Sequence, residues 1–170
     1  TNAKAIANDS HVVSFVVSDT ADHITAKIAD LIASGVKLAS IVETGAISSV
    51  ALTASQYSTV LTGKFSNFTA TVSGVLAANA STVASNAKVA SVSVSDTAAH
   101  LSTSLNALRE IGNKLAAITN LDNAALSISV NHLARDAAIL AKINGGSYIL
   151  NVTGVPVVAV PGVSANPHVV

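Results

Sequence analysis

The sequence predicts an α/β repeat solenoid of short parallel strands alternating with helices, built from two copies of a ~77-residue unit. One reason is that the passage VSDTADHITAKIADL at 17–31 returns as VSDTAAHLSTSLNAL at 94–108. A second reason is that the hydrophobic period changes from strand-like to helix-like in the same order in both passages. A third is that half of the residues are apolar but only 3% are aromatic, and small aliphatic side chains suit closely stacked backbone layers. A compact α/β layered domain is the alternative.

The two copies keep a constant offset of 77 residues over their first halves. The matched positions are Ser18, Asp19, Thr20, Ala21, His23, Lys37, Leu38, Ala39 and Ile41 with Ser95, Asp96, Thr97, Ala98, His100, Lys114, Leu115, Ala116 and Ile118. Later segments drift slightly, with VALTASQY at 50–57 answering LSISVNHL at 126–133 and TATVSGV at 69–75 answering ILNVTGV at 149–155. Small insertions in turns explain such drift.

Each copy is expected to open with a strand and a capped helix. Alternating valines and Phe15 predict strands before residues 19 and 96. The Ser-Asp-Thr sequence then supplies side-chain oxygens to a helix start, and we predict Asp19 and Asp96 as the N-caps, each worth ~1 kcal/mol. The apolar stripe of each helix is Ile24, Ile28 and Leu31 in the first copy and Leu101, Leu105 and Leu108 in the second. Gly35 and Gly112 follow the ends of these helices, where a left-handed C-terminal cap favours glycine.

The second half of each copy predicts strand, strand, helix and strand. KLASI at 37–41 and KLAAI at 114–118 are the second strands, and third strands pass through Val50 and Leu52 or Leu126 and Ile128. A shorter helix closes on residues 64–65 or 142–143, and FTATV or YILNV is the last strand. Strands that alternate with helices are typical of parallel pairing through helical crossovers.

The predicted organisation has five segments. An N-terminal arm at 1–11 precedes copy one at 12–75, an irregular connecting helix at 76–91, copy two at 92–155 and a tail at 156–170. The tail contains Pro156, Pro161 and Pro167 and no Asp, Glu, Lys or Arg, so an extended conformation is expected. Three fates stay open for it: a cap over its own last coil, an added strand on a neighbouring subunit, or ordering by a crystal contact.

The chain carries a recognisable pattern: V-x-D-T-A-x-x-I/L-x-x-x-L-x-x-L, then K-L-x-x-I, a helix ending A-K-I, and Y-x-L-x-V-T-G-V. This pattern resembles a tandem α/β repeat of large secreted, adhesin-like bacterial surface proteins. The match covers residues 12–155 as two copies. The resemblance implies an extracellular, non-enzymatic, adhesive or assembling role. Two departures stand out: the two copies with distinct ends look like a self-contained subunit, and His23 and His100 occupy a position that is more often Asn in the family.

Composition and motifs exclude several classes of function. A net charge of zero with 11% charged residues and no basic run argues against a nucleic-acid partner. The charge-free run between Lys64 and Lys88 is too rich in Ser, Thr and Asn for a membrane span. The absence of Cys is compatible with secretion, and Thr1 in place of Met fits a mature protein or an excised fragment. No nucleophile elbow, phosphate loop or zinc-protease motif is present, so we predict no enzyme and no cofactor.

The five histidines, His11, His23, His100, His132 and His168, invite a metal or haem hypothesis. In a solenoid, equivalent residues two or more coils apart lie ~10 Å or more from each other, too far to share one ion. We therefore predict boundary or surface histidines, with a haem or metal carrier using His23 or His100 as the alternative.

The predicted function is a secreted surface structural protein whose partner is itself, associating head to tail into a filament or lattice with a matrix or adhesive role. A binding module, either an adhesin fragment with a surface or matrix ligand or the carrier named above, is the alternative. The predicted assembly interface is Ile6, Val157, Val158, Val160, Val163, Val169 and Val170.

Overall fold

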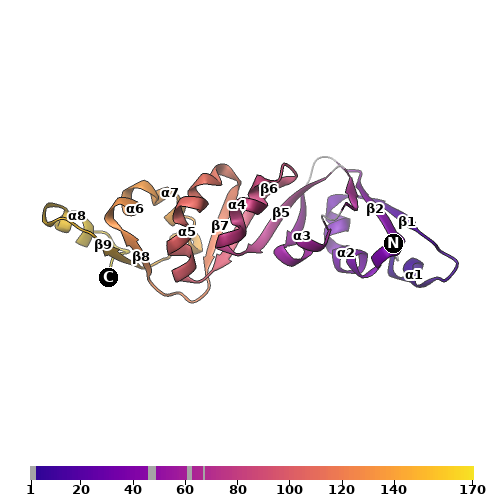
Figure 1. Ribbon diagram of the computed structural model, residues 1–170, viewed down its shortest axis with the longest axis horizontal. Helices are drawn as coiled ribbons and strands as arrows, with labels where there is room; N and C mark the ends of the chain where they lie inside the picture. The colour runs from indigo at the N-terminus through magenta and orange to yellow at the C-terminus, as the bar shows by residue number, and fades with distance from the viewer. Residues whose placement is uncertain (1–2, 46–48, 61–62, 67) are drawn as a thin grey trace. The chain divides into compact units, whose positions relative to one another are not determined.

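The computed structural model describes residues 3–45, 49–60, 63–66 and 68–170, and shows a mixed α/β chain with parallel sheets (Figure 1). The chain divides into two compact units. Unit 1 comprises Thr1–Ser73 and Ala87–Ala90, and unit 2 comprises Gly74–Asn86 and Ser91–Val170.

Unit 1 contains two sets of parallel strands. Its elements are α1 (Ala3–Asn8), β1 (Phe15–Asp19), α2 (Ala21–Ala33), η1 (Gly35–Lys37), β2 (Leu38–Glu43), β3 (Ser49–Thr53), α3 (Ala54–Val60), β4 (Phe65–Ser66) and β5 (Thr69–Val75), which continues into unit 2. The order β1-β2-β4 forms one sheet, and β3 pairs with β5. The short strand β4 is an element that the sequence pattern did not predict.

Unit 2 also combines parallel strands with helices. Its elements are η2 (Ala77–Asn79), α4 (Ala80–Ser85), β6 (Val89–Asp96, which begins in unit 1), α5 (Ala98–Glu110), η3 (Gly112–Lys114), β7 (Leu115–Asn120), β8 (Leu126–Ser129), α6 (Val130–Arg135), α7 (Ala137–Leu140), η4 (Asn144–Gly146), β9 (Leu150–Thr153), η5 (Val157–Ala159) and α8 (Val160–Ser164). Strand β6 pairs with β7 and β8 with β9, in parallel. Single parallel bridges join Ile118 to Ile143 and Leu150 to Val169.

The core of each unit is mostly aliphatic, with Phe65 and Phe68 also buried in unit 1, and the predicted helix stripes are buried. On α2 the stripe residues Ile24, Ile28 and Leu31 are at most 5% exposed, and on α5 the corresponding leucines are at most 1% exposed. Both helices end before a glycine with positive φ, 58° at Gly35 and 62° at Gly112, as a left-handed C-terminal cap requires. The β1–β2 and β6–β7 ladders also share an irregularity, which falls after Phe15 in one and after Val92 in the other.

The predicted helix caps are wrong by one residue. The N-caps of α2 and α5 are Thr20 and Thr97, whose extended φ/ψ values of about −75° and 157° place them just outside the helices. Asp19 and Asp96 are the last residues of their strands, so their carboxylates accept a hydrogen bond from the backbone N–H of the following Thr.

The predicted terminal segments also differ from the structure. The tail is not extended throughout, because it contains η5 and α8, with Pro161 in the first turn of α8. Proline is tolerated there since the first helical amides have no intrahelical partner and its fixed φ suits a helix. The N-terminal arm contains α1, and the connecting segment holds η2 and α4 but gives way to β6 from Val89, before the predicted start of copy two.

Candidate functional site

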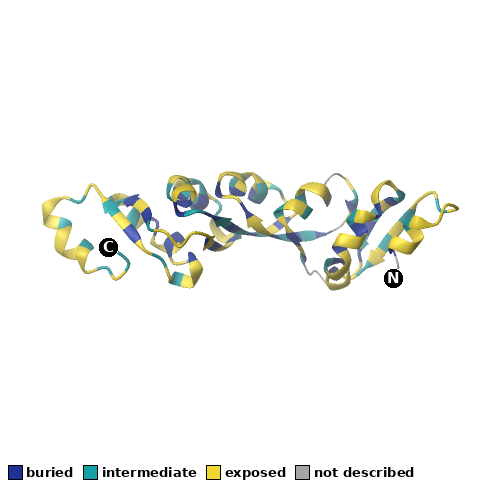
Figure 2. Cartoon of the chain, turned by 90° about the horizontal axis from the view of Figure 1, so that it is seen from below, coloured by how far each residue is buried: buried dark blue, intermediate teal, exposed yellow. Residues whose placement is uncertain are grey.

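The predicted interface residues lie at the two ends of the chain, and most of them are exposed. Ile6 on α1 is 36% exposed, Val157 and Val158 on η5 are 88% and 89% exposed, and Val160 and Val170 are 47% and 77% exposed. Val163 and Val169 are of intermediate exposure, and 156–170 contains no buried residue, as the mostly yellow and teal C-terminal segment in Figure 2 shows.

The last residues of the tail are held by their own chain. The Leu150 amide donates to the His168 carbonyl over 2.7 Å, and the Val170 amide donates to the Leu150 carbonyl over 3.1 Å. The imidazole of His168 stacks on the Tyr148 ring, with centroids 4.0 Å apart. The end of the tail therefore folds back onto its own chain, and Val169 serves as an internal strand partner of Leu150.

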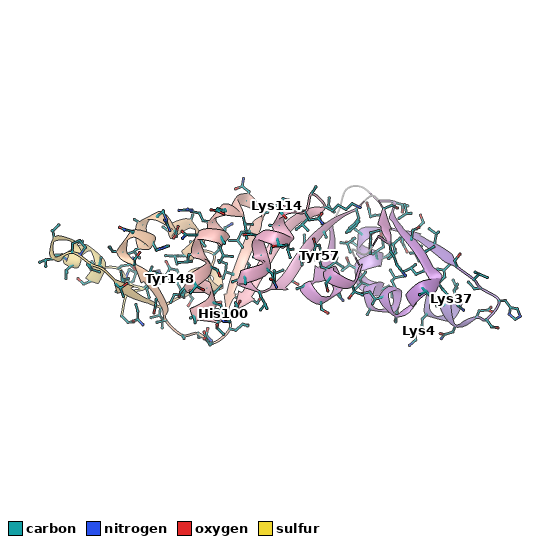
Figure 3. All side chains as sticks on the ribbon, viewed as in Figure 1. Lys4, Lys37, Tyr57, His100, Lys114 and Tyr148 are labelled. Atoms are coloured by element: carbon teal, nitrogen blue, oxygen red, sulfur yellow. The ribbon has the colours of Figure 1, made fainter. Side chains whose placement is uncertain are left out.

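Two Asp–His pairs stand at equivalent places, at the starts of α2 and α5. In each pair the Nδ1 atom of His lies 2.7 Å from the Asp Oδ1 atom, His23 with Asp19 and His100 with Asp96. The imidazoles point outward, with side chains 72% and 70% exposed, and His100 is labelled in Figure 3. The carboxylates differ, since the Asp19 side chain is 32% exposed and that of Asp96 is 6% exposed.

The difference in burial comes from the segment before β6. The backbone N–H of Ala77 donates to Asp96 Oδ2 over 3.0 Å, and Ala77 is 1% exposed. Burial raises the pKa of Asp96, but hydrogen bonds from His100, Ala77 and Thr97 outweigh it and hold that pKa below the ordinary value. The hydrogen bond from His23 and then that from the Thr20 amide likewise lower the pKa of Asp19.

A cavity of about 470 Å³ opens beside Asp19 in unit 1. Its lining comes from α1, β1 and α2 and is apolar at Ala3, Val17, Ile24, Ala26 and Leu31. Polar side chains complete the lining: Asp19, His23, Lys27 and Asp30. Among the described residues, the hydrogen bonds given to the Asp19 side chain all end on Oδ1. The hollow is therefore mostly apolar, with the charged side chains of Asp19, Lys27 and Asp30 among its lining.

A buried charge cluster in unit 2 links α5 to the α6–α7 junction. Asp136 is fully buried, accepts from His132 Nδ1 over 2.5 Å and from Arg135 Nε over 3.2 Å, and pairs with Arg109 over 3.5 Å. Burial raises the pKa of Asp136, but hydrogen bonds from Arg135 and His132 outweigh it and lower that pKa overall. These contacts satisfy the carboxylate with side chains of its own unit, so the cluster is structural.

The structure describes no group of three or more His, Cys, Asp or Glu side chains able to hold a metal ion within the ranges given above. His23 and His100 each have a carboxylate partner at Nδ1, and their side chains are 72% and 70% exposed. Across the same ranges, no helix has the length and apolar character needed to cross a bilayer.

The sequence pattern did not point to the contact that Ala77 makes with Asp96, nor to the similarity between the tail and residues 73–90. Residues 153–170 align with 73–90 at a constant offset of 80, and Gly74, Val75, Val83, Asn86 and Val89 return as Gly154, Val155, Val163, Asn166 and Val169. This signal is visible in the printed sequence. The three tail prolines, which have no counterpart in 73–90, conceal it.

No family model, curated protein or solved structure matches the chain. Its functional assignment therefore depends on the geometry of its own residues.

Proposed function

We propose that the chain is a non-enzymatic, secreted surface structural protein, a two-copy α/β solenoid that assembles head to tail into a filament or lattice with a matrix or adhesive role. The observation that carries this proposal is the exposure of Val157 and Val158, 88% and 89%, on a tail without Asp, Glu, Lys or Arg. Neighbouring apolar side chains held in solvent are typical of a surface that a partner covers.

The rest of the surface favours a partner identical to the chain. A formal net charge of zero provides little long-range repulsion between copies. The parallel strand-and-helix layers favour a heterologous contact between the two different ends, and such a contact generates a fibre when its rotation does not close. The repeat resemblance supports secretion, and the lack of Cys is compatible with it.

Sedimentation velocity across a concentration series, followed by negative-stain microscopy, tests this proposal. We expect concentration-dependent species and regular fibres or sheets, strengthened by ammonium sulfate because the contact is apolar. A single monomeric species at all concentrations, with or without sulfate, would refute the assembly function.

The second candidate is a haem or metal carrier, favoured by one observation. In both Asp–His pairs a carboxylate holds Nδ1 of an exposed imidazole, and metal-ligating histidines commonly have such a partner on the ring nitrogen that does not bind the metal. Titration with haemin or Zn²⁺ tests it: a saturable absorbance band or bound zinc that is lost in the His23→Ala and His100→Ala variants supports a carrier. No binding above that of the double variant refutes it.

A further inference from the structure

We propose that a small pocket in unit 2 binds one ring of a neutral saccharide. This asparagine pocket is lined by Asn120, Asn123, Asn144, Ser147, Tyr148 and Ile149. The inference rests on the adhesive role in the proposed function and names the class of its ligand. It does not involve the residues of the predicted assembly interface.

The asparagine pocket lies where three segments of unit 2 meet. Asn120 ends β7, Asn123 belongs to the loop that follows, and residues 144–149 form η4 and the stretch before β9. All of these residues lie in the part of the chain that the structure describes. The pocket has a volume of about 130 Å³, below the range of about 300–1,000 Å³ that is typical of sites for drug-sized ligands. It therefore suits a single sugar ring rather than a cofactor.

Hydrogen bonds between the asparagines hold the polar wall of the pocket in place. The Asn120 backbone N–H donates to Asn144 Oδ1 over 3.0 Å, and Asn144 Nδ2 donates to Asn123 Oδ1 over 3.4 Å. Asn123 and Asn144 have φ values of 52° and 46°, a conformation that Asn adopts more readily than most residues with a side chain. Asn123 Nδ2 donates to no atom of the described residues, so its two protons are available to a ligand.

Asn120 adds an acceptor that the described chain leaves unsatisfied. Its Nδ2 group donates to the Ala124 carbonyl over 2.9 Å, whereas its buried Oδ1 atom accepts no hydrogen bond from any described residue. Asn120 as a whole is 4% exposed. Buried acceptors without a donor are uncommon, because they lose the hydrogen bonds that water gives them in the unfolded chain. A hydroxyl group that enters the pocket beside Asn120 supplies such a donor.

Tyr148 and Ile149 provide an apolar wall beside the amides. The Tyr148 ring, labelled in Figure 3, is stacked on the His168 imidazole with an angle of 14° between the ring planes. His168 Nδ1 also lies 3.1 Å from the Tyr148 carbonyl oxygen, so a hydrogen bond accompanies the stacking. Ile149 is 43% exposed. Because one face of a sugar ring carries mainly C–H groups, that face can pack on this wall while the hydroxyl groups contact the amides.

The described lining of the pocket offers no charged partner to an ion. Tyr148 has the only titratable side chain among these lining residues, and burial raises the pKa of its hydroxyl, which is therefore neutral at pH 7. A phosphate, carboxylate or ammonium group placed here loses hydration without gaining an opposite charge. Sugar hydroxyls are uncharged and both donate and accept hydrogen bonds, as amide and serine side chains do. The pocket therefore favours a neutral saccharide over an anion or a cation.

Unit 1 carries different side chains at the aligned positions. At the offset of 77, Asn120 corresponds to Glu43, which is 8% exposed. At the offset of 80, Tyr148 corresponds to Phe68, which is 7% exposed and lies against Phe65 with ring centroids 4.4 Å apart. The aligned segments of unit 1 thus fold with a carboxylate and a buried phenyl ring at these places. Folding alone does not explain why unit 2 has an amide and a partly exposed tyrosine there.

Saturation-transfer difference NMR on the full chain tests the pocket, since this measurement works for monomers and polymers alike. The probes are the methyl glycosides of glucose, galactose, mannose and N-acetylglucosamine, with glucuronate and glucose 6-phosphate as charged comparators. We expect at least one neutral glycoside to bind saturably with a Kd of about 1–10 mM, and both charged sugars to bind at least about tenfold more weakly. No saturable signal from any of the four glycosides, or equal binding of the charged sugars, overturns the proposal.

Matched glycine variants locate the binding site. Asn123→Gly and Asn144→Gly each remove an amide but keep the positive φ, and Asn113→Gly removes an exposed amide of unit 2 outside the pocket lining. We expect the two pocket variants to raise the Kd at least about tenfold and Asn113→Gly to change it less than about twofold. Ser147→Phe fills the pocket without removing these amides, and it replaces any glycine variant whose melting temperature falls. Unchanged binding in the pocket variants overturns the site.

Sedimentation velocity of the parent chain separates this site from the assembly function. A chain that stays monomeric but binds a glycoside overturns head-to-tail assembly and supports the saccharide site. A chain that polymerises but binds none of the four glycosides overturns the saccharide site alone.

Discussion

Replacing Asp96 by Ala should lower stability substantially, and the amount can be worked out from its contacts. The carboxylate is 6% exposed and accepts from three donors: the amides of Thr97 and Ala77 and Nδ1 of His100. His100 can turn to solvent, but the Ala77 amide is left buried without an acceptor, which alone costs about 1–3 kcal/mol. With the lost charge-assisted bond at Thr97, we expect a loss of about 3 kcal/mol in the free energy of unfolding.

Thermal melts followed by circular dichroism at pH 7, at a concentration where the chain is monomeric, measure this effect. A loss of about 3 kcal/mol corresponds to a midpoint lowered by about 6–12 °C for a chain of this size. The matched control is Asp19→Ala, which removes the same two Oδ1 contacts from a carboxylate that is 32% exposed. Equal shifts in the two variants would refute the argument that the buried Ala77 amide sets the difference.

Three further predictions concern the core, a turn and the acid limb. Leu105→Ala, at a position 1% exposed on α5, should cost about 3 kcal/mol and lower the urea midpoint, and no change would mean that α5 does not hold unit 2 together. Gly112→Ala should lower the free energy of unfolding by about 1 kcal/mol because the φ of Gly112 is 62°, although no atom lies within 4 Å of the added Cβ. Gly162→Ala in α8 is the control and should not lower it. Equal losses in the two variants would contradict the backbone argument. The lowered pKa of Asp136 means that it adds stability above its unfolded value near ~3.9 and loses it as pH falls through the folded pKa. The stability gap between the parent chain and Asp136→Asn should therefore narrow below about pH 4 in urea titrations, and a constant gap would contradict this sign.

Local patterns predicted most of the elements because their causes are local. The leucines of α5 are spaced four and three residues apart, and Gly112 follows the end of the helix, so the helix and its C-terminal end could both be predicted from the sequence. The cap was misplaced by one residue because Asp96 and Thr97 are both good capping residues, and only the backbone angles distinguish them. Strand β4 could not be predicted, since a two-residue strand depends on the strand beside it rather than on its own period.

The candidate site was predictable in part. The exposure of Val157 and Val158 followed from an uncharged, proline-bearing tail. The fold-back of Val169 onto Leu150 did not, because that pairing depends on tertiary contacts such as the stacking of His168 on Tyr148. The cavity beside Asp19 required coordinates, since its lining comes from the separate elements α1, β1 and α2.

The pairing of Val169 with Leu150 ties the last residues of the chain to β9. An assembly contact that displaces the end of the tail would require this pairing to open first, and growth should then show a slow unimolecular step that does not accelerate with protein concentration. A chain shortened after Ala159 retains Val157 but lacks the Val169–Leu150 pairing, and it should elongate without the slow unimolecular step. The contact that fixes the last residues of a single molecule would then also limit the rate at which molecules join.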